Sequence, residues 1–296
     1  MAEQPYVFIT DSDSDLAYNI ADERQIPVIR MPFAVDGVEY LDENGREGEA
    51  KQKEFFDKMR AGSVPITSCL SKVNYIEFME PFLAKGKDIL YVAFSSKMSA
   101  TPNYAREAWE ELSARYPERR LIIADTLSIS EPMALLVEAA HDLYLQGASM
   151  EEVEQWILDN RMKAQAWLTV DNLVYLKRGG RLSPTSAFFG SMLDIKPIIV
   201  IGRGGKMDAV EKAKGRKKAI QTIIERTAEA IGDPAGKTVV VMHADAPDEA
   251  QRMKEKLKEK LPGLKEIRIQ MIGPVIGAHC GPGTVAFAFI GKERTN

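Results

Sequence analysis

The chain has 296 residues, which accommodates two domains of ordinary size, each able to bury a substantial apolar core. Its 39 lysines and arginines stand against 43 aspartates and glutamates, and the resulting formal charge of -4 argues against a nucleic acid as the main partner. Apolar residues make up 45% of the chain, but no run approaches the roughly 20 residues of a membrane helix, so we expect a soluble protein.

The first half alternates short β-rich runs with amphipathic helical patterns, which is typical of a parallel sheet with helices on its faces. We expect an N-terminal parallel-sheet α/β/α domain over residues 1–163. Its expected strands are 6–10, 88–94 and 120–125, and its last expected helices are 132–146 and 150–162.

The segment FITDSDSD (8–15) places Asp11 and Asp13 directly after the first strand. This Asp-x-Asp arrangement is typical of haloacid-dehalogenase-like phosphatases, whose chemistry needs magnesium and further downstream carboxylates. No suitable downstream motif follows. The simpler interpretation is that Ser12 or Asp13 caps the first helix.

Two hydroxyl-rich loops follow strands or precede helices in the same half. In TSCLS (67–71), Ser71 is the expected N-cap of a helix, and in FSSKMSATPNYA (94–105), Thr101 is the expected N-cap with Pro102 at the first helical position. In an open α/β sheet, ligands bind at the carboxyl ends of the strands. Neutral hydroxyls without a phosphate-loop lysine favour a carboxylate, although each loop on its own is also compatible with simple helix capping.

From about residue 164 the pattern changes, and we expect a C-terminal mixed-sheet α/β domain over residues 164–296. Asp171 is the expected cap of a helix that Gly179 ends, and Ser183 with Pro184 is expected to start another. The expected strands are 166–170, 196–201, 238–244, 266–272 and 284–290, and the expected helices are 172–178, 216–231 and 247–260.

Basic residues gather in KRGGR (177–181) and KAKGRKK (212–218). A solvated face is the simplest interpretation, and docking of an acidic partner or an anionic membrane is the alternative.

The segment IGPVIGAHCGPG (272–283) is expected to be a glycine-rich turn between two strands. A metal site lacks ligands, because His141 and His243 belong to other elements. A thiol nucleophile is disfavoured because the neighbouring His279 and Cys280 would point apart on an extended turn. A structural histidine and a ligand-binding histidine both stay open.

The chain has two cysteines, Cys69 and Cys280, and the N-terminus lacks the features of a secretory signal. Both observations predict a cytoplasmic location.

Together, ITDSDSDL, TSCLS, FSSKMSATPNYA, YLKRGGRLSPTSAFFG, EKAKGRKKAI and IGPVIGAHCGPG resemble the DegV family of bacterial lipid-binding proteins, in the family's order from position 9 to 283. The resemblance implies a fatty acid held between the two domains, with its acyl chain in an apolar tunnel. It also implies a separate ATP-dependent fatty acid kinase subunit that phosphorylates the bound acid to acyl phosphate. The chain would then be a non-catalytic carrier without a metal or cofactor.

The family's carboxyl-binding residues would fall here on Thr67 or Ser68, on Ser96 and Ser99, and on His279, with Arg181 near the entrance or the partner surface. The resemblance also suggests that Cys69 and Cys280 flank this site from opposite domains. The alternatives are a magnesium-dependent phosphatase or phosphotransferase using Asp11 and Asp13, and a small-molecule sensor without a kinase partner.

Overall fold

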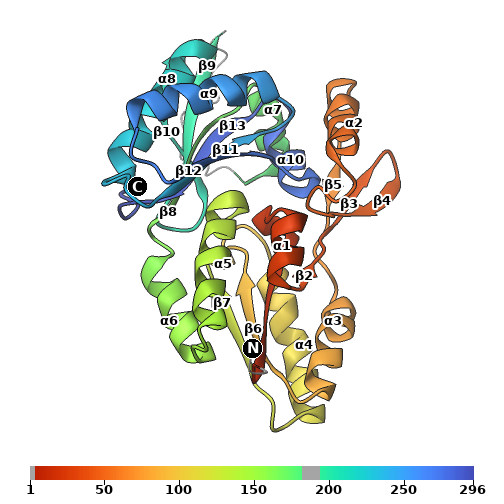
Figure 1. The fold of residues 1–296 in the computed structure, drawn as a ribbon. Helices are drawn as coiled ribbons and strands as arrows, with labels where there is room; N and C mark the ends of the chain where they lie inside the picture. The colour runs from red at the N-terminus through yellow and green to blue at the C-terminus, as the bar shows by residue number, and fades with distance from the viewer. Residues whose placement is uncertain (1–3, 182–193) are drawn as a thin grey trace.

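The chain folds into two α/β halves that share a core (Figure 1). The structure is a computed structural model, and it describes residues 4–181 and 194–296. The first sheet has the order β2-β1-β6-β7, and all its strands are parallel, as the sequence predicts. Its strands are β1 (Tyr6–Asp11), β2 (Val28–Ile29), β6 (Asp88–Ala93) and β7 (Leu121–Asp125).

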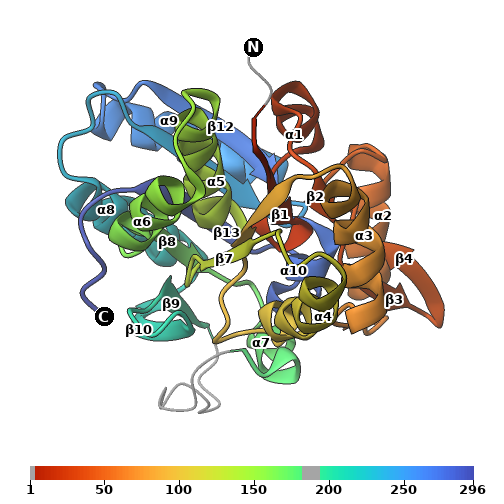
Figure 2. The same ribbon diagram turned by 90° about the horizontal axis from the view of Figure 1, so that it is seen from below.

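Helices cover both faces of this sheet (Figure 2). On one face, α3 (Lys72–Ala84) and α4 (Thr101–Arg115) pack against each other and against β6 and β7. On the other face, α5 (Ser130–Leu145) contacts β1, and α6 (Met150–Asn160) contacts β7. The short α1 (Tyr18–Arg24) follows the first strand.

An antiparallel hairpin that the sequence analysis missed projects beside these layers. It is formed by β3 (Pro32–Val35) and β4 (Val38–Leu41), with β5 (Ile66–Thr67) on the other edge of β3 and α2 (Glu49–Arg60) alongside. Every residue of β4 is exposed, so no buried face imposes the alternating pattern by which a strand is recognised.

The second sheet is mixed, as expected, and has the order β10-β9-β8-β13-β11-β12. Only β11 and β12 pair in parallel, and the other neighbours are antiparallel. Helices α8 (Arg216–Ile231) and α9 (Pro247–Lys260) pack on this sheet, while α7 (Leu173–Gly179) and α10 (Pro274–Cys280) contact each other. The strands are β8 (Ala164–Thr169), β9 (Ile195–Ile201), β10 (Met207–Lys214), β11 (Thr238–His243), β12 (Glu266–Met271) and β13 (Val285–Ile290).

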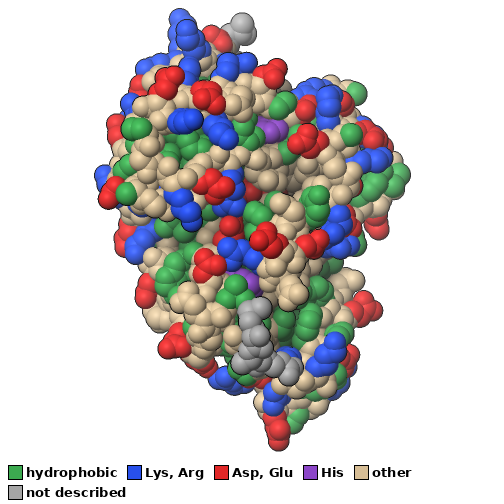
Figure 3. All heavy atoms as spheres, viewed as in Figure 1, with side chains coloured by type: hydrophobic (Ala, Val, Ile, Leu, Met, Phe, Trp, Pro, Cys, Tyr) green, Lys and Arg blue, Asp and Glu red, His purple; other side chains and the backbone are tan. Residues whose placement is uncertain are grey.

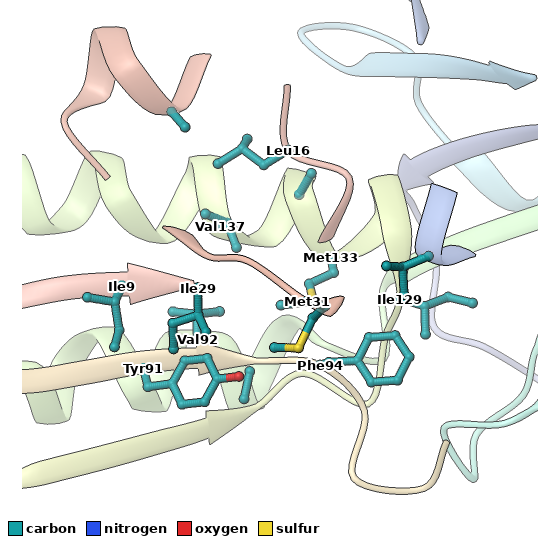
Figure 4. Packing of buried hydrophobic residues seen from close by; sticks show 14 of the residues in the cluster. Ile9, Leu16, Ile29, Met31, Tyr91, Val92, Phe94, Ile129, Met133 and Val137 are labelled. Carbon is teal, nitrogen blue, oxygen red and sulfur yellow. The ribbon is translucent and has the colours of Figure 1, made fainter. Parts of the chain in front are cut away.

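Helix α5 belongs to both halves. It contacts β1 of the first sheet and β8 and β13 of the second, so its apolar residues are buried on more than one side. Met133, Leu136 and Val137 are all fully buried, and Figure 4 shows Met133 and Val137 among the packed side chains of the shared core. The domain division expected at residue 163 therefore falls directly before β8, but the apolar core crosses it.

Several expected helix starts need correction. Ser71 does cap α3, in a capping box with Asn74, as predicted. In α4, however, the N-cap is Ala100, and Thr101 is already the first helical residue. Asn172, and not Asp171, caps α7, since its side chain accepts a hydrogen bond from the Val174 N–H.

Two further expectations about local structure are wrong, and one lies outside the described residues. Ser12 and Asp13 do not cap α1, because they form the separate 3₁₀ turn Ser12–Ser14, and α1 starts after Ala17. The glycine-rich segment 272–283 is not only a turn, because α10 forms within it. The helix start expected at Ser183 and Pro184 falls in the segment 182–193, outside the described residues.

The surface carries charges of both signs, and the face seen in Figure 3 intersperses lysines and arginines with aspartates and glutamates. Among the described residues, no helix has both the length and the apolar character needed to cross a membrane.

Arg294, near the C-terminus, joins the two halves although only 3% of it is exposed. Its guanidinium donates to the carbonyls of Ala164 (2.8 Å), Leu127 (2.7 Å) and Gly202 (3.3 Å) and to the Ser128 hydroxyl (3.2 Å). Burial lowers the pKa of Arg294 to about 10. One cation thus satisfies acceptors from three segments, including Leu127, whose φ of 45° is unfavourable for a branched side chain.

We expect Arg294→Gln to lower the free energy of unfolding by about 3 kcal/mol, because buried acceptors lose a charged donor. Urea unfolding of the variant and the parent protein measures this difference. Arg252→Gln, on the exposed surface of α9, is the matched control and should change stability by less than about 0.5 kcal/mol. Equal stability of the Arg294 and Arg252 variants would contradict the assignment.

Candidate functional site

A small cavity of about 60 Å³ lies between the two halves and collects most of the predicted carboxyl-binding residues. We call it the head-group cavity. It opens where β1 and β6 end in the first half and where α10 lies in the second. Its polar lining is Asp13, Thr67, Ser68, Cys69, Ser99, Thr101, Arg181 and His279, and its apolar lining is Met31, Phe94, Met98, Val275 and Ile276.

The central contact joins Thr67 of β5 to His279 of α10, with 2.9 Å between Thr67 Oγ1 and His279 Nε2. His279 Nδ1 is buried and has no hydrogen-bond partner among the described residues. Burial, assisted by the positive charge of Arg181, lowers the pKa of His279 to about 4. The imidazole is therefore neutral near pH 7, so His279 acts through hydrogen bonds and not as a cation.

Two glycines allow α7 and the end of α10 to approach closely enough to hold His279. A Cβ atom on Gly179 would lie 2.5 Å from His279 Nδ1, so any side chain there would displace the ring. Gly281 has a φ of +80°, and a Cβ atom there would lie 2.1 Å from the Tyr175 ring. The glycines in the GGR and GPG stretches thus position the histidine through close packing.

Ser99 brings the loop after β6 to the same cavity. Its hydroxyl donates to Thr101 Oγ1 (2.9 Å) and lies 3.6 Å from Cys69 Sγ. The loop is held from both halves through Ser95, whose N–H donates to the Ser128 carbonyl (3.0 Å) and whose hydroxyl donates to the Gly205 carbonyl (2.7 Å). Ser99 is therefore fixed before any ligand arrives.

The remaining predicted residues divide into two groups. Ser68 and Arg181 line the cavity together with Thr67, Ser99 and His279. Ser96 does not line it, and the Ser96 N–H instead donates to Asp125 Oδ1 (3.3 Å). A direct role for Ser96 stays a prediction.

A second pocket of about 230 Å³ shares Thr67, Arg181 and His279 with the head-group cavity. Arg178 adds a second cation to its lining. A group held at Thr67 and His279 would thus face a basic pocket on one side. Another pocket, of about 340 Å³, lies elsewhere, between the β3–β4 hairpin and α2, and none of the predicted carboxyl-binding residues lines it.

Sequence reasoning did not assign several lining residues to the carboxyl-binding site, and the most informative of them is Asp13, which it named only as a helix cap or for the alternative enzyme. Its position directly after β1, at the carboxyl edge of a parallel sheet, was the available signal. The apolar residues Met31 and Phe94, both visible in Figure 4, come from loops whose approach depends on tertiary packing.

Two buried aspartates of the first half hold the start of α10. Asp15 Oδ1 accepts a hydrogen bond from the Gly273 N–H (2.9 Å), and Asp42 Oδ2 accepts one from the Val275 N–H (3.4 Å). Burial raises the pKa of Asp15 to about 7, and burial together with the charge of Asp15 raises the pKa of Asp42 to about 8. These contacts set the position of His279 relative to Thr67.

The two cysteines have different environments, and both are free thiols. Cys69 is exposed and lines the head-group cavity, whereas Cys280 is buried, and burial raises its pKa to about 12. A buried thiol with such a pKa is inert near pH 7.

Asp11 is engaged in the first half, where its Oδ2 accepts hydrogen bonds from the Tyr91 hydroxyl (2.6 Å) and the Phe94 N–H (3.1 Å). Burial raises the pKa of Asp11 to about 6. Within residues 4–181 and 194–296, no three histidine, cysteine, aspartate or glutamate side chains converge so as to hold a metal ion.

The fold and the cavity define a two-domain α/β protein with a polar site where the halves meet. The chain belongs to the DegV family, since it matches the family described as "Uncharacterised protein, DegV family" over residues 6–292. A DegV domain-containing protein of Clostridium perfringens is 36% identical over 289 residues, which cover 98% of this chain and 98% of that protein.

Solved structures of the family have the same fold. A DegV family protein from Thermus thermophilus, described by its fatty acid binding, superposes with a TM-score of 0.85 at 26% identity, over 97% of this chain and 100% of that one. DegV from Bacillus subtilis, described as a fatty acid binding protein, gives a TM-score of 0.83 at 26% identity, over 98% and 100% of the two chains. The resemblance and the fold class inferred from the sequence are thus confirmed.

The raised pKa values of Asp15 and Asp42 predict a pH-dependent stability. A carboxyl whose pKa is higher in the folded state stabilises that state fully below its unfolded pKa, and this contribution is lost as the pH rises through the folded value. The protein should therefore lose stability from above about pH 4, near the ordinary aspartate pKa of 3.8, up to about pH 8, where the carboxyl of Asp42 ionises in the folded state.

Asp42→Asn should reduce this loss by about 2 kcal/mol or more, because the amide keeps an acceptor for Val275 but does not ionise. Urea unfolding across the pH range measures it. Asp57→Asn, on the exposed face of α2, is the control. Its free energy of unfolding should change with pH as that of the parent protein does, since salt bridges lower the pKa of Asp57. An unchanged slope in Asp42→Asn would show that this carboxyl does not titrate in the range.

Proposed function

We propose that this protein is a cytoplasmic carrier that binds one long-chain fatty acid and presents its carboxyl group to a separate ATP-dependent kinase subunit for phosphorylation to acyl phosphate. The observation that carries the proposal is the convergence of Thr67, Ser99 and His279 on one cavity between the halves. The relatives from Thermus thermophilus and Bacillus subtilis, which are fatty-acid-binding proteins, support the ligand class.

The chemistry of the lining suits a carboxyl group. Hydroxyls and a neutral imidazole supply hydrogen bonds, and Arg181 supplies one cation at the edge. A buried carboxylate costs several kcal/mol unless its oxygens are well hydrogen-bonded, so such a cluster selects for the head group.

The acyl chain would supply most of the affinity. At roughly 0.8 kcal/mol per buried methylene, a 16-carbon chain offers about 12 kcal/mol before the cost of association. The head-group cavity of about 60 Å³ holds only the carboxyl end. The tunnel for the chain would open by movement of lining side chains such as Met31 and Met98, whose unbranched thioethers adapt readily.

The basic pocket beside Thr67 and His279 supports the transfer step. Arg178 and Arg181 line it, and cations there would attract the phosphates of a nucleotide held by the partner. We propose that this side, with KRGGR and KAKGRKK, is the docking surface for the kinase subunit and makes transient contact with anionic membranes. In this role the chain itself catalyses no reaction.

Organic extraction of the purified protein, followed by mass spectrometry, tests the carrier function. We expect about one fatty acid per chain. Absence of a lipid together with magnesium-dependent phosphatase activity that Asp11→Asn abolishes would instead support the alternative enzyme. A different small molecule in the extract would support a sensor without a kinase partner.

Ser99→Ala should weaken palmitate binding by roughly 10-fold to 100-fold, the value of one hydrogen bond to a charged group. Binding of hexadecanol, which has the same tail without the carboxyl group, should weaken much less. Titration calorimetry on delipidated protein compares the two ligands. Ser113→Ala on α4 is the matched control; an equal loss for both ligands in Ser99→Ala would contradict a head-group role.

In a reconstituted system with a fatty acid kinase subunit, ATP and palmitate, acyl phosphate should form only when this chain is present. Arg181→Ala should slow its formation, trapped as the hydroxamate, by about 10-fold or more because a cation facing the phosphates is lost. Lys254→Ala on α9 is the control. Unchanged formation in Arg181→Ala would contradict the transfer role while leaving fatty acid binding intact.

A further inference from the structure

The 3₁₀ turn after β1 leaves one buried side-chain oxygen without a hydrogen-bond partner among the described residues. Ser12 Oγ accepts a hydrogen bond from the Met31 N–H (2.9 Å), and Ser14 Oγ donates to the Asp11 carbonyl (2.7 Å) and accepts from the Leu16 N–H (3.2 Å). Asp13 lies between them, is 5% exposed, and its Oδ1 has no hydrogen-bond partner among the described residues. The turn is thus held by its serines, and Asp13 is not needed to close it.

Asp13 lines the head-group cavity together with Thr67, Ser99 and His279. A buried carboxyl oxygen without a partner costs free energy, and such a group needs an explanation. A ligand in the cavity would supply the missing partner. The position of Asp13 therefore points to the ligand's own head group.

Two carboxyl groups can meet in a buried site only if they share a proton, because two adjacent negative charges would repel each other at low dielectric. The surroundings of Asp13 add to this constraint. His279 of α10 is neutral, and Arg181 is the cation that lines the cavity. The other titratable groups that interact electrostatically with Asp13 are Asp11, Asp15, Asp42, Cys69 and Tyr75.

We propose that Asp13 is a further ligand-binding residue whose carboxyl group shares one proton with the carboxyl group of the bound fatty acid. This inference rests on the proposed function. The pair forms as Asp–COOH with R–COO⁻, so one O–H···O⁻ hydrogen bond is made, no covalent bond breaks, and the pair carries one negative charge. The hydroxyls of Thr67 and Ser99 and the cation of Arg181 then stabilise that single charge.

The electrostatics agree with this geometry. Burial, followed by the charges of Asp11, Asp42 and Asp15, raises the pKa of Asp13 well above its usual value. This direction favours the protonated form of Asp13, which can donate a hydrogen bond to an ionised ligand. Above the pKa of Asp13 the proton must be taken up on binding, so affinity should fall by about tenfold per pH unit.

The test measures palmitate affinity of delipidated protein from about pH 6 to about pH 10 by titration calorimetry. The parent protein of this test and all its variants carry Cys69→Ser, which removes the thiol beside Asp13. We expect the parent protein to lose affinity at the alkaline end, with uptake of about one proton per palmitate measured in buffers of different ionisation enthalpy. At pH 6, the palmitate affinity of Asp13→Asn should be within a few-fold of the parent's, because the amide also donates a hydrogen bond. At alkaline pH, this variant should lose less affinity than the parent, because the part of the loss that comes from ionisation of Asp13 is absent.

Asp11→Asn is the matched control, since Asp11 belongs to the same buried segment but does not line the cavity. It should keep the proton uptake, moved to lower pH because a neighbouring negative charge is removed. Asp15 and Asp42 are unchanged in Asp13→Asn, so the pH dependence due to them remains in that variant. Hexadecanol, which has no carboxyl group, should bind without the step that belongs to Asp13.

A parent protein that binds palmitate with no pH dependence, or an Asp13→Asn variant with the parent's proton uptake, would overturn the role of Asp13 while leaving the carrier function in place. Failure of palmitate to bind the parent protein at any pH would instead contradict the proposed function itself. If Asp13→Asn does not fold, Asp13→Ser in the same background takes its place, and a serine variant that keeps the parent's proton uptake would overturn the role of Asp13.

Discussion

The hydrogen bonds from the first turn of α10 to Asp15 and Asp42 are the constraint on which the candidate site depends. Helix α10 is only seven residues long and cannot hold its own orientation through propensity. Carboxyl groups from the other half satisfy its first N–H groups, and Gly179 and Gly281 permit the close packing at its other end. His279 is therefore positioned by both halves at once, and the site exists only while the halves stay together.

Other contacts between the two halves likewise make the apolar core continuous across the two sheets. Helix α5 packs on strands of both sheets. Arg294 donates hydrogen bonds to a carbonyl of each half, one of them in the loop 126–129. That loop also receives the Ser95 N–H, from which the Ser99 loop extends. These contacts between the halves orient the hydroxyl groups that line the head-group cavity. A ligand that binds there would then not have to supply the free energy of ordering them.

The regular elements were predictable because their pattern of apolar residues repeats over enough positions to be recognised. Strands β1 and β6 and the helices of the second half lie close to their expected bounds. The exposed strand β4 was not predictable because none of its residues is buried, and α10 was not because seven residues are too few for a helical period to be recognised. The N-cap of α4 lies one residue before the expected Thr101, at Ala100, which makes no side-chain cap hydrogen bond. The N-cap of α7 lies one residue after the expected Asp171, because the adjacent Asn172 side chain accepts the Val174 N–H instead. Thr67, Ser99 and His279 came from family resemblance, and only tertiary structure could bring Asp13 to them.

An acid-binding cavity beside Asp11, Asp13, Asp15 and Asp42 is understandable only if those carboxyls are largely neutral or hydrogen-bonded. Burial raises the pKa of each of them, which favours their protonated forms, and Asp11 also accepts hydrogen bonds from the Tyr91 hydroxyl and the Phe94 N–H. The first three come from a single segment at the carboxyl end of β1, where the chain turns sharply. A fully ionised cluster would repel a fatty acid carboxylate, whereas a protonated one donates hydrogen bonds to it. In the proposed carrier, the free energy that the buried carboxyls cost the fold would thus give selectivity for an acidic head group, while the acyl chain would supply affinity without regard to charge.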